Sequence, residues 1–96
     1  MSVNDLFEKH EEEFLKFERV EKKLSSRPDL HAFIFLDGLF PAEKEGRDMV
    51  AAASHDQIYL DVSCEQCEEL TESDVIELLR CGILYSDSEE GLYAFT

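Results

Sequence analysis

The chain has 96 residues, 44% of them hydrophobic, which is enough for one domain over residues 1–96 with a modest core. That hydrophobic fraction excludes a disordered chain, while 23 acidic against 9 basic residues give a formal charge of −14. Residues 51–96 hold eleven acidic residues and one basic residue, Arg80, so most of the charge lies in the second half. Such a field repels nucleic acid and anionic membranes and attracts basic proteins. We therefore expect the partner to be a basic protein surface, with no direct nucleic-acid or membrane contact.

Residues 3–25 are predicted to form a long amphipathic helix. Ser2 and Asp5 have the spacing of a capping box at its start. Apolar residues recur on one face, with His10 in the middle of the stripe and Leu15 on the opposite side. The stripe can pack on the next helix as an antiparallel hairpin. It can also join two copies of the chain, so a monomer and a dimer through this helix are both open.

The most apolar segment, residues 30–40 (LHAFIFLDGLF), is predicted to be a core helix. Ser26 can cap its first turn, and Pro28 loses no hydrogen bond there. Pro41 marks the end of the helix. Asp37 falls on the apolar side, where we expect its carboxylate to reach water or a backbone N–H near the helix end. The alternative is a buried acid with a raised pKa and a functional role.

A β-hairpin is predicted from residues 49–54 and 58–62. The second segment alternates strictly, with apolar side chains on one face and Tyr59 and Asp61 on the other, which is typical of a half-buried strand. The first segment is less regular, and the hairpin is its simplest interpretation. Residues 63–70 can form a short helical turn.

Residues 71–81 are predicted to be a helix, and residues 83–85 and 92–95 a second hairpin. Two pairs of residues could cap the start of that helix: Thr71 with Asp74, or Ser73 with Glu77. Gly82 suits the position just after the helix, and Gly91 suits a turn position with positive φ.

The predicted element order is α-α-β-β-α-β-β. It indicates a two-layer α+β fold, in which a helical hairpin accompanies an antiparallel sheet of about four strands. Its last part, helix-strand-turn-strand, has the outline of the end of a winged-helix domain. A DNA-reading wing needs lysine and arginine for phosphate contacts, and this part of the chain offers only Arg80. We therefore do not expect DNA binding.

Three cysteines is an odd number, which disfavours a secreted disulfide framework and favours a reducing cytoplasm. Cys64 and Cys67 form a CxxC pair, which Cys81 and His55 could complete as a Cys3His zinc site. The spacing matches no common zinc motif, and the glutamates around the pair raise rather than lower a thiol's pKa. Partly buried thiols without a cofactor are the main expectation, and a small zinc-binding structural domain is the alternative.

Three segments carry a resemblance: PDLHAFIFLDGLFP, DMVAAASHDQIYLDV and TESDVIELLRCGILYSDSEEGLYAF. From residue 28 onward the chain resembles small, acidic, uncharacterised proteins encoded by phages and plasmids. The resemblance implies a mobile-element origin and assigns no functional residue. Phage proteins of this size and charge often act as inhibitors or nucleic-acid mimics against host machinery.

No catalytic motif is recognisable, since the chain lacks a glycine-rich phosphate loop and the Ser-His-Asp, HExxH and EF-hand spacings. We therefore expect a binding module rather than an enzyme. Its binding surface is predicted to combine exposed acids with tyrosine anchors. The candidate residues are Asp56, Tyr59, Asp61, Glu65, Glu68, Glu69, Glu72, Glu89, Glu90 and Tyr93.

Overall fold

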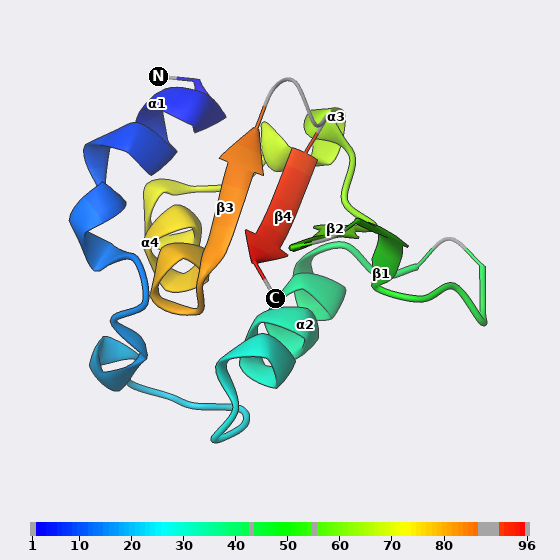
Figure 1. The fold of residues 1–96 in the computed structure, drawn as a ribbon, viewed down its shortest axis with the longest axis horizontal. Helices are drawn as coiled ribbons and strands as arrows, with labels where there is room; N and C mark the ends of the chain where they lie inside the picture. The colour runs from blue at the N-terminus through cyan, green and yellow to red at the C-terminus, as the bar shows by residue number, and fades with distance from the viewer. Residues whose placement is uncertain (1, 43, 55, 87–90, 96) are drawn as a thin grey trace.

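The computed structural model describes residues 2–42, 44–54, 56–86 and 91–95 and shows an α+β fold (Figure 1). The elements are α1 (Val3–Lys9), the 3-10 turns η1 (Glu11–Glu13) and η2 (Phe17–Arg19), α2 (Pro28–Leu39), β1 (Val50–Ala53), β2 (Gln57–Leu60), α3 (Cys64–Cys67), α4 (Glu72–Arg80), β3 (Ile83–Ser86) and β4 (Gly91–Phe95). The predicted fold class and the broad order of its elements are confirmed.

The described strands form one antiparallel sheet in the order β1-β2-β4-β3, so the two hairpins join through β2 and β4. Ile58 and Ile83 both lie opposite Ala94, which places these three side chains on one face of the sheet. Tyr59 lies opposite Tyr93 on the other face. Figure 1 shows α1 and α4 on the same side of β3, and α2 next to the C-terminal end of β4.

Helix α4 lies at the centre of the core. Its inner side chains Val75, Leu78 and Leu79 have no exposed surface. Its start is fixed by a capping box, in which the Thr71 hydroxyl accepts the Asp74 N–H at 3.2 Å and the Asp74 carboxylate accepts the Thr71 N–H at 3.0 Å. The first of the two predicted capping pairs is therefore confirmed.

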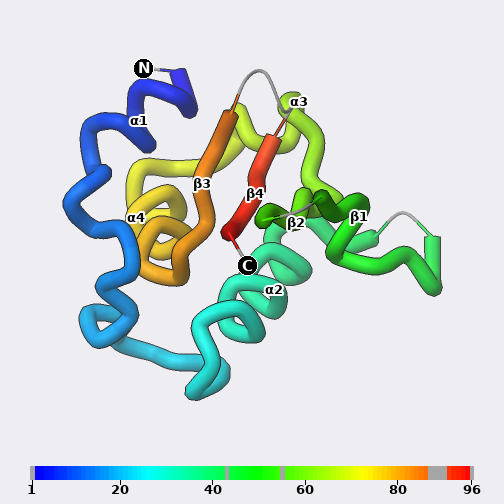
Figure 2. Tube along the Cα trace, viewed as in Figure 1, coloured from blue at the N-terminus to red at the C-terminus, as the bar shows by residue number. Residues whose placement is uncertain are grey.

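The prediction of one long helix over residues 3–25 is wrong beyond the first turns, because α1 ends at Lys9. Leu15 has a φ of 63°, which a right-handed helix cannot accommodate. Its N–H donates to the carbonyl of Leu79 at 3.0 Å, at the end of α4, and its side chain lies against Gly82. Contact with α4 therefore replaces helical hydrogen bonds, and Figure 2 shows this segment running along α4 before it reaches α2.

Helix α1 packs mainly on α4 and β3, and α2 also packs on α4. The Phe7 ring stacks on Tyr85 of β3, with the ring centroids 5.9 Å apart. The expected hairpin of the first two helices is thus replaced by separate contacts of each with α4. Phe14 and Phe17, which belong to the predicted apolar stripe of residues 3–25, pack against the chain's own core. The stripe therefore offers less apolar surface for contact with a second copy of the chain.

Helix α2 begins at Pro28 with Arg27 in the N-cap position, so the predicted Ser26 cap is wrong. Arg27 is extended, with φ of −100° and ψ of 124°, as the residue before a proline prefers. The helix buries His31, Ala32 and Leu36 on one side only. Its other side is exposed to solvent and includes Asp37, which is not the buried acid of the alternative interpretation.

Gly91 stands at a close approach between two backbone segments. Its φ is 149°, and a Cβ there would lie 2.7 Å from the carbonyl oxygen of Val62. The predicted positive φ is confirmed, and the contact fixes the start of β4 against the segment after β2. The residues of the turn before it lie outside the described part of the chain.

Candidate functional site

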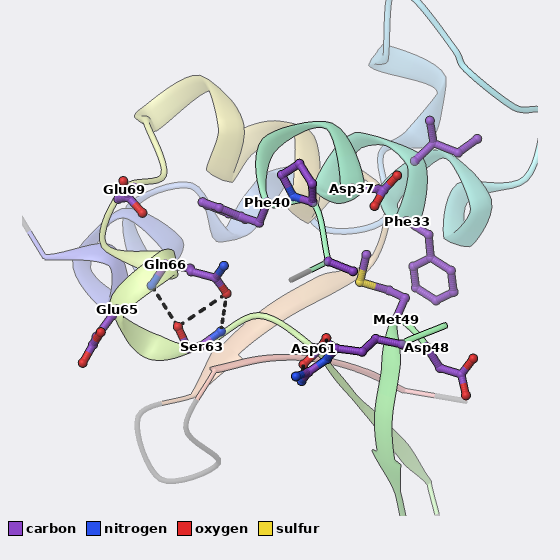
Figure 3. A pocket seen from close by; sticks show the side chains of 14 residues that line it. Phe33, Asp37, Phe40, Asp48, Met49, Asp61, Ser63, Glu65, Gln66 and Glu69 are labelled. Carbon is purple, nitrogen blue, oxygen red and sulfur yellow. Dashed lines mark hydrogen bonds and ion pairs between the residues drawn. The ribbon is translucent and has the colours of Figure 1, made fainter. Parts of the chain in front are cut away.

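A pocket of about 590 Å³ lies between α2, α3 and the loop that leads into β1 (Figure 3). Its apolar lining consists of Phe33, Ile34, Phe40, Pro41, Ala42 and Met49. Its charged lining consists of Asp37, Arg47, Asp48, Asp61, Glu65 and Glu69. Ser63 and Gln66 complete it. The pocket thus combines apolar walls with carboxylates from several segments of the chain.

Helix α2 supplies one wall because three of its lining residues share a side of the helix. Phe33, Ile34 and Asp37 lie on one face, because Asp37 follows the other two at spacings of four and three residues. In Figure 3, Met49 lies between Asp61 on one side and Phe33 and Asp37 on the other. The apolar and acidic residues of α2 therefore border the same space.

Asp61 is held in place by the first hairpin. It directly follows β2, and its backbone N–H donates to the carbonyl of Met49 at 2.7 Å. Its carboxylate accepts two hydrogen bonds from Arg47, from Nε at 2.9 Å and from Nη2 at 2.5 Å. This is the paired geometry in which a guanidinium and a carboxylate fit best.

A short helix positions the acids at the other end of the pocket. Ser63 and Gln66 form a capping box at the start of α3, with the Ser63 hydroxyl accepting the Gln66 N–H at 3.2 Å. Glu65 and Glu69 follow four residues apart, and Figure 3 places both at the end of the pocket near α3. The cap thus fixes the segment that carries these two carboxylates.

The charges around the pocket do not balance. Among the described residues that line it there are five carboxylates and one guanidinium, which leaves an excess of four negative charges. Within the described ranges of the chain, no ion pair reaches Asp37, Asp48, Glu65 or Glu69. Such a site attracts cationic groups and repels phosphate.

Three predicted binding residues, Asp61, Glu65 and Glu69, come together in this pocket. Tyr59 and Tyr93 instead face each other on the outer side of the sheet. Two further candidates, Asp56 and Glu68, are exposed but do not line the pocket, and Glu89 and Glu90 lie outside the described residues. Sequence reasoning missed Asp37 and Asp48 as pocket acids. The spacing of Phe33, Ile34 and Asp37 was the available signal for Asp37.

Glu72 joins two helices instead of bordering the pocket. Its carboxylate accepts hydrogen bonds from Lys9 Nζ at 2.8 Å and from His10 Nε2 at 2.7 Å. The bond from Lys9, and then that from His10, lowers the pKa of Glu72 from 4.5 to about 2. Its position therefore favours a structural role, as a link between α1 and α4.

The thiols are spread over two elements and make no disulfide. Cys64 and Cys67 lie on α3, and Cys81 follows α4. Burial raises the pKa of Cys67 and of Cys81 to about 12, so both thiols are protonated near neutral pH. Among the residues with described positions, no group of three or more His, Cys, Asp or Glu side chains is placed to hold a metal ion. His55, the fourth ligand of the alternative site, is not one of them.

Comparisons with protein-family models, with curated proteins and with solved structures find no match to this chain. In the described part of the chain, no helix is long and apolar enough to cross a membrane.

Proposed function

We propose that this protein is a binding module without catalytic activity that docks on a basic surface of another protein. The observation that supports this is the pocket, where uncompensated carboxylates surround apolar walls. The carboxylates would speed the encounter with a basic partner and set its orientation. The apolar walls would bury side chains of the partner and slow its release.

The chemistry of the pocket favours a protein over a metal ion or a nucleic acid. A calcium ion takes six to eight oxygen ligands around one point. Here the carboxylates come from α2, from the loop before β1, from the end of β2 and from the α3 segment, around apolar walls. A phosphate backbone would meet this excess of negative charge. A protein segment with basic and apolar side chains meets neither obstacle.

The resemblance to phage and plasmid proteins extends this proposal to a class of partner. An inhibitor from a mobile element would act in the cytoplasm on a host protein that normally holds DNA or RNA. The formal charge of −14 suits a mimic of nucleic acid at such a surface. No cofactor is needed for this role.

A pull-down from nuclease-treated bacterial lysate, eluted in steps of rising salt, tests the proposal. The site variant combines Asp61→Asn, Glu65→Gln and Glu69→Gln. The control variant combines Glu8→Gln, Glu18→Gln and Glu21→Gln, which removes the same charge from exposed acids of residues 3–25. We expect wild type and control to retain a basic protein to the same salt step and the site variant to release it earlier. Equal retention of the basic protein by both variants would contradict the proposal. Added DNA tests the hypothesis of a nucleic-acid mimic, which predicts that DNA displaces the captured protein.

A further inference from the structure

We infer that the pocket receives an arginine side chain from the partner, and that Arg47 occupies the same carboxylate in the free protein. This inference rests on the proposed function, because it names the group that the basic partner inserts. It also gives Arg47 a role, as a competitor of the partner's arginine for the Asp61 carboxylate. The negative charge of the pocket alone does not require such a role.

The Arg47–Asp61 pair shows what the pocket can bind. Both oxygens of the Asp61 carboxylate accept N–H groups of one guanidinium, at 2.9 and 2.5 Å. The backbone hydrogen bond from Asp61 to Met49 holds the main chain that carries this carboxylate. A guanidinium matches this site with two parallel hydrogen bonds, whereas a lysine ammonium offers a single point of charge.

The walls of the pocket suit the rest of an arginine side chain. Phe33, Phe40 and Met49 line it with apolar surface beside the carboxylates. Arginine lays its aliphatic stem along apolar surface while its head stays in a polar environment, and its planar head can stack on a ring. Asp37, from α2, and Glu69, at the α3 end, supply further negative charge to the same space.

Arg47 lies outside the buried core. Its side chain is 51% exposed, and it lies in an exposed loop that turns at Gly46, where φ is 94°. An ion pair with this much exposure is weak, so a partner arginine can replace it. Until it does, the apparent affinity for the partner is reduced by the fraction of molecules in which Asp61 is already occupied.

The test uses three peptides with one variable residue: acetyl-Leu-Arg-Leu-amide and its lysine and citrulline counterparts. Citrulline keeps the shape of arginine without its charge. Each peptide is titrated into isotope-labelled protein, and the dissociation constant is taken from NMR shifts of the pocket residues. We expect the arginine peptide to bind more tightly than the lysine peptide, and the citrulline peptide to bind least.

Three variants separate competition by Arg47 from a general change of charge. Arg47→Ala removes the competitor, and Lys44→Ala removes one positive charge from the same exposed loop as the matched control. We expect Arg47→Ala to bind the arginine peptide about two- to fivefold more tightly than Lys44→Ala does, the range that an exposed ion pair allows. Asp61→Asn should abolish the preference for arginine over lysine. Thermal unfolding of each variant confirms that it is folded.

The inference is overturned if Arg47→Ala and Lys44→Ala bind equally, or if the lysine peptide binds as tightly as the arginine peptide. In either case the proposed function stands as long as the pocket acids are needed to retain the partner in the pull-down. Failure of the arginine peptide to shift the pocket residues in both wild type and Arg47→Ala also overturns the inference, and the pull-down then judges the proposed function separately.

Discussion

His31 shows how a single polar side chain can fasten an irregular segment to the core. It is 1% exposed, and its Nδ1 accepts the backbone N–H of Leu24 at 3.0 Å. The neutral ring therefore carries its proton on Nε2, which lies 3.0 Å from the carboxylate of Glu77 on α4. The ring also packs between Phe17 and Phe35. One histidine thus connects the segment before α2, α2 itself and α4.

Replacing His31 tests this connection. We expect His31→Leu to lower the free energy of unfolding by about 1–3 kcal/mol, because it leaves the Leu24 N–H without its acceptor. His31→Asn is the matched control, since its amide oxygen can take the place of Nδ1 and should recover part of the loss. Urea unfolding of the three proteins gives the comparison. Equal stability of His31→Leu and wild type would show that the Leu24 bond contributes nothing.

At the scale of elements, two sets of ion pairs fasten the N-terminal segment to α4. Glu72 at the start of α4 binds Lys9 and His10. Near its end, Arg80 binds the Glu13 carboxylate, which also pairs with Arg19. Hydrogen bonds from Arg80, and then from Arg19, lower the pKa of Glu13. The N-terminal segment is thus held at both ends of the helix that it covers.

The pH dependence of stability tests the first of these links. The pKa of Glu72 is about 2 in the folded protein against 4.5 ordinarily, so folding favours its ionised form. Its contribution to stability is full above pH 4.5 and disappears as the pH falls from 4.5 toward 2. We therefore expect Glu72→Gln to be less stable than wild type at neutral pH, with the difference closing near pH 2.

The measurement is the urea midpoint of unfolding of wild type and Glu72→Gln, compared from neutral pH down to about pH 2. Glu21→Gln is the control, because Glu21 is exposed and has no ion pair among the described residues. A stability difference that stays constant with pH would rule out ionisation of Glu72 as its cause.

Elements with strong local signals were predictable from the sequence. Alternating apolar and polar residues around Tyr59 identified β2, and the Thr71–Asp74 capping pair identified α4. Both signals depend only on residues that are neighbours in the chain. The end of α1 was not predictable, since the turn at Leu15 is fixed by the carbonyl of Leu79, far away in sequence. The pocket was only partly predictable, because it also depends on contacts between segments that are distant in sequence. Asp61, Glu65 and Glu69 could be named as exposed acids, but their grouping with Asp37 and Asp48 depends on how α2 and α3 meet.

At the scale of the whole molecule, charge and packing are separated in space. The helices and the inner face of the sheet share one cluster of buried side chains. The unbalanced carboxylates of Asp37 and Glu65 lie outside it, around the pocket. The outer face of the sheet, with Tyr59 and Tyr93, is a second surface that a partner could contact. The proposed docking therefore requires that the partner cover the pocket and not this outer face.

The most direct test is to map the partner on the protein. The basic protein captured in the pull-down is added to isotope-labelled chain, and NMR shifts are recorded for every assigned amide. We predict that the largest shifts fall at the pocket, around Asp37, Met49 and Asp61, with small shifts at Tyr59 and Tyr93. The opposite pattern, with shifts confined to the outer face of the sheet, would contradict the pocket as the binding site.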